Sequence, residues 1–176
     1  MRMTRQSRRL ATFLLLAATA WPTAAQLFRD RDFDEEKMSW KEIEAQIPLY
    51  PRPENLIPFE ASAASPHRFY IDAASLSLGE DGVMRYTLVV KAAGGATNVT
   101  YEGIRCETRE QKSYAFGRAG SGWTRTRDPQ WRRVEDIGAN RHHFVLYADF
   151  FCPTLRAIAT PKQVLESLRR ESHRLR

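Results

Sequence analysis

Cysteine is scarce in this chain, and the common signatures of cofactor binding and hydrolysis are absent from it. The 176 residues include 2 cysteines. They form neither a CxxC pair nor the CxxCH motif of haem attachment, and one thiol pair supplies only two of the four ligands of a structural zinc site. The triplet Gly120-Ser121-Gly122 lacks the second glycine of the G-x-S-x-G nucleophile elbow. We therefore expect no metal, no cofactor and no catalytic residue.

Long apolar runs are also lacking, apart from one near the N-terminus. Arginines within residues 2–9 precede the apolar run 10–20, and the small residues Thr23-Ala24-Ala25 follow it. This order is typical of a secretory signal peptide, and an apolar core of about eleven residues is too short to cross a bilayer as a helix. We predict cleavage after Ala25 and export to the periplasm or beyond, with no membrane-spanning segment afterwards. No cysteine stands directly after the apolar run, so we do not expect a lipid anchor.

The excess of positive charge lies largely in this leader. The whole chain has 27 basic and 21 acidic residues, for a net charge of +6. The leader holds four of the arginines and no acidic residue, so the remainder has 23 basic and 21 acidic residues and a charge of +2. A charge of that size gives little reason to expect nucleic-acid binding. We expect no nucleic acid among the partners.

The two cysteines, Cys106 and Cys152, suit an exported chain, because disulfides persist outside the cytoplasm. A bridge between them would close a loop of 46 residues, which stabilises the fold by about 4 kcal/mol in the chain-entropy model. The alternative is a pair of buried free thiols.

The N-terminal part of the mature chain, residues 26–59, shows three different patterns. Residues 26–38 are charged and aperiodic, which predicts a flexible arm. Ser39 and Glu42 form a capping-box pattern and predict a short helix over residues 40–46, which Pro48 would end. Prolines and apolar residues then alternate up to residue 59. This pattern favours an extended strap lying across the domain, or else a docking segment for a partner.

The centre of the chain predicts antiparallel β structure. Residues 83–92 alternate, with Met84, Tyr86, Leu88 and Val90 expected on one face and Arg85, Thr87 and Lys91 on the other. Gly94-Gly95 is a hairpin signal, and Gly103 is a candidate bulge. The predicted strands are residues 67–73, 83–92, 97–106, 112–117, 122–127 and 143–150.

A closing helix is predicted after Thr160, because Thr160 is a suitable N-cap, Pro161 suits the first helical position and Gln163 completes a capping box. Together these elements predict one α+β domain over residues 39–172, followed by a short tail, 173–176. Its antiparallel, meander-like sheet would have about five to six strands, with a helix near each end. A β-sandwich is the alternative.

Several segments are similar to one known family. They are DGVMRYTLVV, ATNVTYEGIRCETRE and KSYAFG in the centre, WKE and PLYPRPENLIPF upstream, and FFCP downstream. Together they resemble the cryptic neisserial protein 1-like family of exported proteobacterial proteins, over residues 40–168. The resemblance implies a single-domain envelope protein and supplies no catalytic residue.

One cluster of residues in the second half of the chain could form a ligand surface. Arginines there are interleaved with tryptophans, a combination that binds anionic or sugar ligands through bidentate hydrogen bonds and stacking. The candidates are Arg118, Trp123, Arg125, Arg127, Trp131, Arg132 and Arg133. The alternative is an exposed edge strand whose charges block pairing with other sheets.

Other polar residues give weaker signals. His142 and His143 would point to opposite faces of the predicted strand 143–150, so they should not bind one metal ion. Asp72, Glu102 and Asp149 could lie close together, as the paired carboxyl groups of glycosidases do. The leading hypothesis is a non-enzymatic domain that binds or supports an envelope component, be it protein, glycan or anion. The alternative is an envelope hydrolase using those carboxylates; the oligomeric state stays open.

Overall fold

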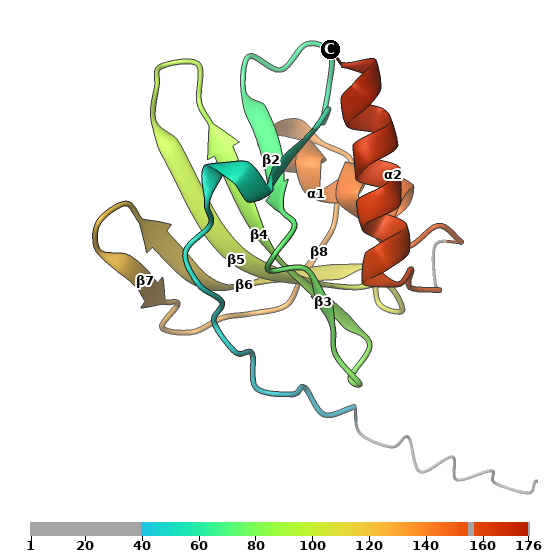
Figure 1. Cartoon of the computed structure of the whole chain (residues 1–176). Helices are drawn as coiled ribbons and strands as arrows, with labels where there is room; N and C mark the ends of the chain where they lie inside the picture. The colour runs from blue at the N-terminus through green and yellow to red at the C-terminus, as the bar shows by residue number, and fades with distance from the viewer. Residues whose placement is uncertain (1–39, 155–156, 176) are drawn as a thin grey trace, which may run out of the picture. The chain divides into compact units, whose positions relative to one another are not determined.

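The structure, a computed structural model, describes residues 40–154 and 157–175 (Figure 1). The predicted leader, the cleavage point at Ala25 and the arm over residues 26–38 lie outside the described residues. Those predictions therefore stand as sequence-based expectations.

An antiparallel sheet is the main structural element of the described chain (Figure 1), in agreement with the α+β expectation. The strands among the described residues are β1 (Leu56–Phe59), β2 (Arg68–Asp72), β3 (Ser77–Leu78), β4 (Val83–Lys91), β5 (Thr97–Arg105), β6 (Glu110–Arg118), β7 (Gly122–Arg125) and β8 (Arg132–Arg133). They are ordered β1-β2-β4-β5-β6-β7, with β3 paired to β4 and β8 paired to β6. All eight described strands belong to one sheet, whereas the alternative β-sandwich would have needed two.

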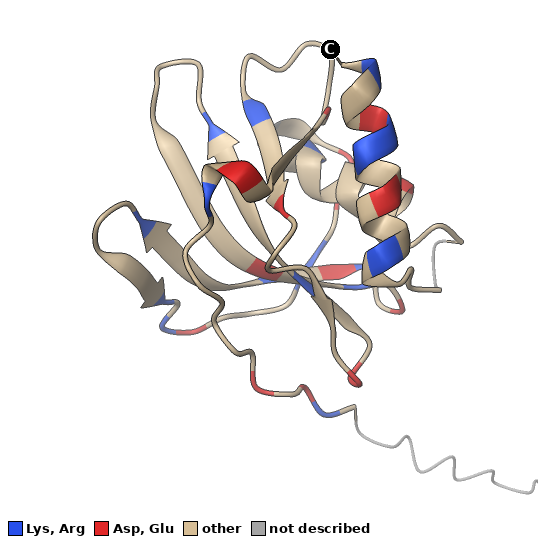
Figure 2. Ribbon diagram, viewed as in Figure 1, with Lys and Arg blue, Asp and Glu red and all other residues tan. Residues whose placement is uncertain are grey.

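The helical elements among the described residues are short except for the last. They are η2 (Pro53–Asn55), η3 (Gly138–Asn140), α1 (Arg141–Val145), η4 (Leu146–Phe151) and α2 (Pro161–Arg174). The expected capping box of α2 is present: Gln163 N–H donates to Thr160 Oγ1, and Thr160 N–H donates to Gln163 Oε1. Val164 and Leu168 are fully buried against the sheet. Charges of both signs alternate along the outer side of α2 (Figure 2), so this helix is amphipathic.

The strand predicted over residues 143–150 is wrong, because α1 and η4 occupy this segment. A short apolar run fits a buried strand and a buried helix equally well, and periodicity alone does not separate them. Here the wide turn of a π-helix puts buried residues five apart: Val145 with Phe150, and Leu146 with Phe151. The N–H of Cys152 donates to Tyr147 O at 2.8 Å, which is the matching five-residue hydrogen bond.

The helix predicted over residues 40–46 is also wrong. The extended strap predicted up to residue 59 is wrong in its second half, because residues 53–55 form η2 and residues 56–59 form β1. Residues 40–50 have neither helix nor strand structure, and we call this segment the strap from here on. The backbone of Ile43 is bound by a side chain of β4 and by one from the turn before it. Ile43 N–H donates to Asp81 Oδ2 at 2.9 Å, and Ile43 O accepts from an Arg85 guanidinium nitrogen at 2.8 Å. These bonds hold the strap extended across the sheet.

The sheet is covered on both faces. Met84, Tyr86 and Leu88 join the core beneath α1, η4 and α2. Arg85 and Thr87 are polar, yet they are only 5% and 0% exposed. They lie on the opposite face, where the strap docks. A second apolar cluster forms there from the sheet and the strap: Ala45, Ile47, Tyr101, Tyr114, Ala115 and Trp123.

Gly103 has a different role from the one expected. The register shift in the β5–β6 pairing falls between Tyr101 and Glu102, so Tyr114 on β6 is the extra residue. Gly103 instead allows a close approach. A Cβ at this position would lie 2.7 Å from the hydroxyl of Tyr114 and 2.8 Å from a methyl carbon of Val83.

We predict that Gly103→Ala lowers the free energy of unfolding by about 1–3 kcal/mol, because the added methyl overpacks this contact. Urea unfolding followed by circular dichroism would measure the loss. Gly94→Ala is the matched control, since a Cβ there meets nothing within 4 Å. Equal stabilities of the two variants would contradict the packing argument.

Candidate functional site

A buried carboxylate and a buried histidine meet on the helix-covered face of the sheet. Glu102 comes from β5 and is 3% exposed; His143 comes from α1 and is 8% exposed. His143 Nε2 lies 2.8 Å from Glu102 Oε2. Because an ionised carboxylate only accepts hydrogen bonds, the nitrogen is the donor. The pair therefore links α1 to the centre of the sheet.

Two hydroxyl groups complete the surroundings of the carboxylate. The Tyr86 hydroxyl donates to Glu102 Oε2 at 2.9 Å, and the Thr100 hydroxyl donates to Glu102 Oε1 at 2.7 Å. Tyr86 is the register partner of Glu102 on β4, and Thr100 lies two residues before it on the same face of β5. Both carboxylate oxygens thus have partners, as a buried charge requires.

Charge pairing outweighs burial at this site. Burial alone would raise the pKa of Glu102, but the charge of His143 and hydrogen bonds from His143 and Thr100 lower that pKa to about 2. Burial would lower the pKa of His143, yet the Glu102 carboxylate raises it above its usual 6.5. Burial and the adjacent carboxylate both raise the pKa of Tyr86 well above 10. The stable state is an ion pair with a neutral phenol beside it.

His143 also lines a cavity of about 710 Å³, which we call the His143 cavity. Its walls come from β6, from β8 and from the segment leading to α1. The lining residues are Gln111, Ser113, Arg132, Arg133, Val134, Glu135, Ile137, Gly138, Asn140 and His143. The volume lies within the roughly 300–1,000 Å³ that is usual for small-molecule sites.

The sheet register decides which side chains face this cavity. Ser113 is the register partner of Glu102, so Ser113 and Gln111 lie on the same face as Glu102. Arg132 pairs with Gln111 and shares that face, whereas Arg133 pairs with Glu110 and points to the other side. Gln111 Oε1 is buried and has no hydrogen-bond partner among the described residues. Because this oxygen has almost no accessible surface, it does not face the open space of the cavity.

The three carboxylates proposed for a hydrolase occupy different environments. Asp72 adjoins Ile71, which pairs with Leu88 on the face of Glu102, so Asp72 is on the opposite face. Burial raises the pKa of Asp72, and nearby hydrogen bonds lower it only in part. Asp149 is exposed and lines a depression beside α2 of about 270 Å³, to which Glu102 does not contribute. Glu102 is bound by His143 instead.

The two tryptophans of the predicted ligand surface contact the strap. The ring of Trp123 lies 5.9 Å from that of Tyr50, measured between centroids. Trp131 lies 5.8 Å from Trp40, and its indole nitrogen donates to Glu42 at 3.2 Å. Both rings thus hold the N-terminal segment on the sheet.

The five arginines of that surface are exposed but do not form one site. The exposed arginines are Arg118, Arg125, Arg127, Arg132 and Arg133. Arg132 and Arg133 line the His143 cavity. Arg125 lies on β7, at the end of the strand order, and lines a separate cavity beside the strap. Its position agrees with the alternative of a charged edge strand.

The histidine pair lies on a helix, contrary to the strand expectation. The rings of His142 and His143 are 4.0 Å apart between centroids, and His142 stacks on Phe69 at 5.1 Å. Within the described part of the chain, no three His, Cys, Asp or Glu side chains come together as a metal site would require.

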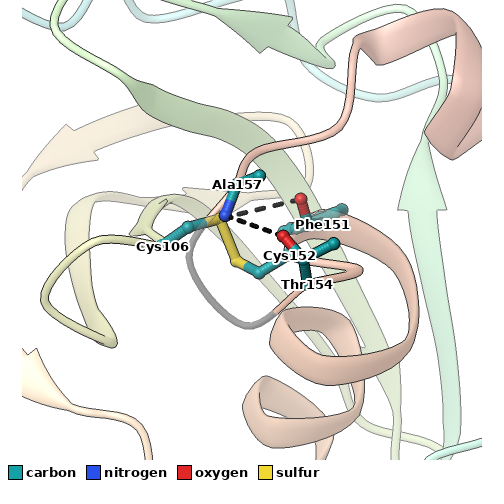
Figure 3. Close-up of a disulfide and its surroundings, with 5 residues drawn as sticks. All are labelled: Cys106, Phe151, Cys152, Thr154 and Ala157. Atoms are coloured by element: carbon teal, nitrogen blue, oxygen red, sulfur yellow. Dashed lines mark hydrogen bonds between the residues drawn. A yellow bond between two sulfur atoms is a disulfide. The ribbon is translucent and has the colours of Figure 1, made fainter.

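A disulfide joins the end of the same helical segment to the sheet (Figure 3). Cys106 follows β5 and Cys152 follows η4, and their sulfurs are bonded with Cα atoms 5.6 Å apart. Cys106 Sγ lies 3.6 Å from the carbonyl oxygen of Phe151. Both residues are at most 2% exposed. The bridge fixes the end of η4 to the sheet, and with it the helical segment that carries His143.

The sequence marks Glu102 as a candidate but does not indicate its partners or the cavity. The strand predicted over residues 143–150 gives no reason to expect a contact between His143 and β5. The alternation of side chains along β4 and β5 could have indicated Tyr86 and Thr100. Both lie on the same face as Glu102 once the register of the two strands is known. No local pattern marks Gln111 or Asn140.

Comparison with known proteins gives one match. Residues 35–169 match the CNP1-like family. No curated protein and no solved structure matches the chain. Among residues 40–154 and 157–175, none of the helices has the length and apolar character needed to cross a bilayer.

Proposed function

The chain belongs to the CNP1-like family, and from this assignment we propose that it is an exported, non-enzymatic binding domain of the cell envelope. The family description names neither an activity nor a ligand. The proposal therefore depends on the site itself, and the His143 cavity is the ligand-binding site that we assign.

The observation that carries the proposal is a polar cavity with a rigid wall. The wall bearing His143 is held by an ion pair to Glu102 and by the disulfide at the end of η4. Fixed walls favour binding because little conformational entropy is lost when a ligand enters. Val134 and Ile137 add apolar lining beside the polar groups, a combination that is usual in small-molecule sites.

The arrangement of the carboxylates supports binding over hydrolysis. A glycosidase needs two carboxyl groups that flank one bond, at most about 9.5 Å apart. Asp72 and Glu102 point to opposite faces of the sheet. Both oxygens of Glu102 are already hydrogen-bonded, and its pKa of about 2 makes it a poor general base or acid at neutral pH.

Export is supported by the sequence and is compatible with the described domain. The leader pattern over residues 2–25 is the direct reason. A buried disulfide is common in exported proteins and rare in cytosolic ones.

In-cell photo-crosslinking tests the function. We predict that a photoreactive residue at Ile137, which lines the cavity and is 66% exposed, captures an envelope component. The same residue at Leu49, which lies on the strap and is 84% exposed, is the control. Mass spectrometry should find an adduct that is specific to position 137. Capture should occur on protein that begins at Gln26 and is recovered from the envelope fraction.

Equal capture from positions 137 and 49 would contradict a specific site in the cavity. Recovery of folded, unprocessed protein from the cytosol would contradict export.

A further inference from the structure

We propose that the ligand of the His143 cavity is a small organic anion that also carries hydrogen-bond donors, as a sugar acid or a hydroxy acid does. This inference rests on the proposed function and names the class of ligand for the same site. It follows from three features of the lining: one unpaired arginine on the cavity face, one unpaired carboxylate and an ion pair that is internally neutral.

Arg132 supplies the group that would bind the anion. Its register partner is Gln111, which places its side chain on the cavity face. Arg132 is exposed and forms no ion pair with any other described residue. A guanidinium binds a carboxylate or phosphate through two parallel hydrogen bonds, so a free one at a cavity wall favours an anionic ligand.

Glu135 supplies the complementary group. Its side chain belongs to the cavity lining, is exposed and forms no ion pair with any other described residue. A carboxylate only accepts hydrogen bonds, so Glu135 would bind a ligand hydroxyl or ammonium group. An anion without donors would leave this acceptor unmatched.

Glu135 also carries an unpaired charge in the lining, and the other charged groups near the cavity are paired or point away. Arg133 points to the other side of the sheet, as its pairing with Glu110 shows. His143 is paired with Glu102, so this pair adds no net charge to the wall. Arg141, which follows the cavity segment, is paired with Asp136 at 2.9 Å. Ser113 and Asn140 are neutral and offer further donors or acceptors for hydroxyl groups. The lining therefore offers one cation for a negative charge and several polar groups for hydroxyl groups.

Three probes of similar size test the assignment on the purified full chain. Galacturonate carries the anion and the donors, galactose carries the donors only, and cyclohexanecarboxylate carries the anion only. Binding would be measured by calorimetry, and its place by NMR shift changes of the Ile137 and Val134 signals. We expect galacturonate to bind more tightly than either of the other two probes.

Variants separate the two contacts. Arg132→Gln should weaken galacturonate binding about tenfold or more, the usual effect of losing a hydrogen bond to a charged group. Glu135→Met should reduce the preference for galacturonate over cyclohexanecarboxylate, because the acceptor for the hydroxyl groups is lost. Arg118→Gln is the control, because Arg118 is an exposed arginine that does not line this cavity. Circular dichroism checks that each variant is folded.

Unchanged galacturonate affinity in Arg132→Gln would overturn the ligand class, as would galactose or cyclohexanecarboxylate binding as tightly as galacturonate. In those cases shift changes at Ile137 would still support a cavity that binds small molecules. The absence of measurable binding by all three probes would also overturn the ligand class. The proposed function would then be tested separately by whether the photoreactive residue at position 137 captures an envelope component.

Discussion

Glu102→Ala should lower the free energy of unfolding by about 3–5 kcal/mol, because it leaves the His143 side chain buried without its partner. The hydroxyls of Tyr86 and Thr100 would lose their acceptor in the same step. Urea unfolding monitored by tryptophan fluorescence would measure the change. Glu102 is the centre of the network, so we expect this to be among the largest effects of any single substitution.

Glu107→Ala is the matched control. Glu107 is also an acidic residue paired with a basic one, Arg105 at 2.8 Å, but its side chain is 75% exposed. Exposed ion pairs contribute at most about 1 kcal/mol. If the two variants lost equal stability, the Glu102–His143 pair would not be a major source of stability.

The contribution of the Glu102–His143 pair to the free energy of unfolding should have a pH optimum. The His143 charge and the hydrogen bonds overcome burial and lower the pKa of Glu102 from 4.5 to about 2, so its contribution is present above pH 4.5 and lost as the pH falls toward 2. Glu102 overcomes burial and raises the pKa of His143 above 6.5. That contribution is complete below pH 6.5 and lost as the pH rises through the raised value.

The difference in unfolding free energy between the unmodified chain and Glu102→Ala should therefore be largest between about pH 4.5 and 6.5. Denaturant titrations across the pH range would measure it. A difference that stayed constant from pH 3 to pH 9 would show that the two groups are not ionised as a pair.

Breaking the Cys106–Cys152 bridge should cost about 4 kcal/mol, the chain-entropy value for a loop of 46 residues. We expect both reduction and the double substitution Cys106→Ala, Cys152→Ala to lower the urea midpoint. The bridge ties η4 to the end of β5, so its loss should also loosen α1 and lower the hydrogen-exchange protection of the His143 amide.

The double variant also provides the control for reduction. Reductant should destabilise the unmodified chain and leave the double variant unchanged. Alkylation before reduction should label neither cysteine in native protein. Two labelled thiols, or equal sensitivity of both proteins to reductant, would contradict the bridge.

Local patterns were sufficient for the elements whose partners are close in sequence. The alternation in residues 83–92 and the turn at Gly94-Gly95 predicted β4 and β5, and Thr160 with Gln163 predicted the start of α2. In each case the stabilising contacts lie within a hairpin or one helical turn, so the sequence shows them directly.

Local patterns failed where distant residues decide the conformation. The helix signal at residues 40–46 is overruled by Asp81 and Arg85, which bind the backbone of Ile43 from about forty positions away. His143 reaches Glu102 across a sequence separation of 41. The candidate site needed the β5–β6 register as well, since only that pairing brings Gln111 and Ser113 to the face of Glu102.

The position of the strap has a consequence for the order of assembly. Glu42 is synthesised early, yet its partner Trp131 follows 89 residues later, and Lys112 follows 70 residues later. The strap must therefore stay undocked until most of the sheet exists, because contacts so distant in sequence close late. During this interval Tyr101 and Tyr114 lack their cover, so a nascent chain is most prone to aggregate, or to be held by a chaperone, through that half of the sheet.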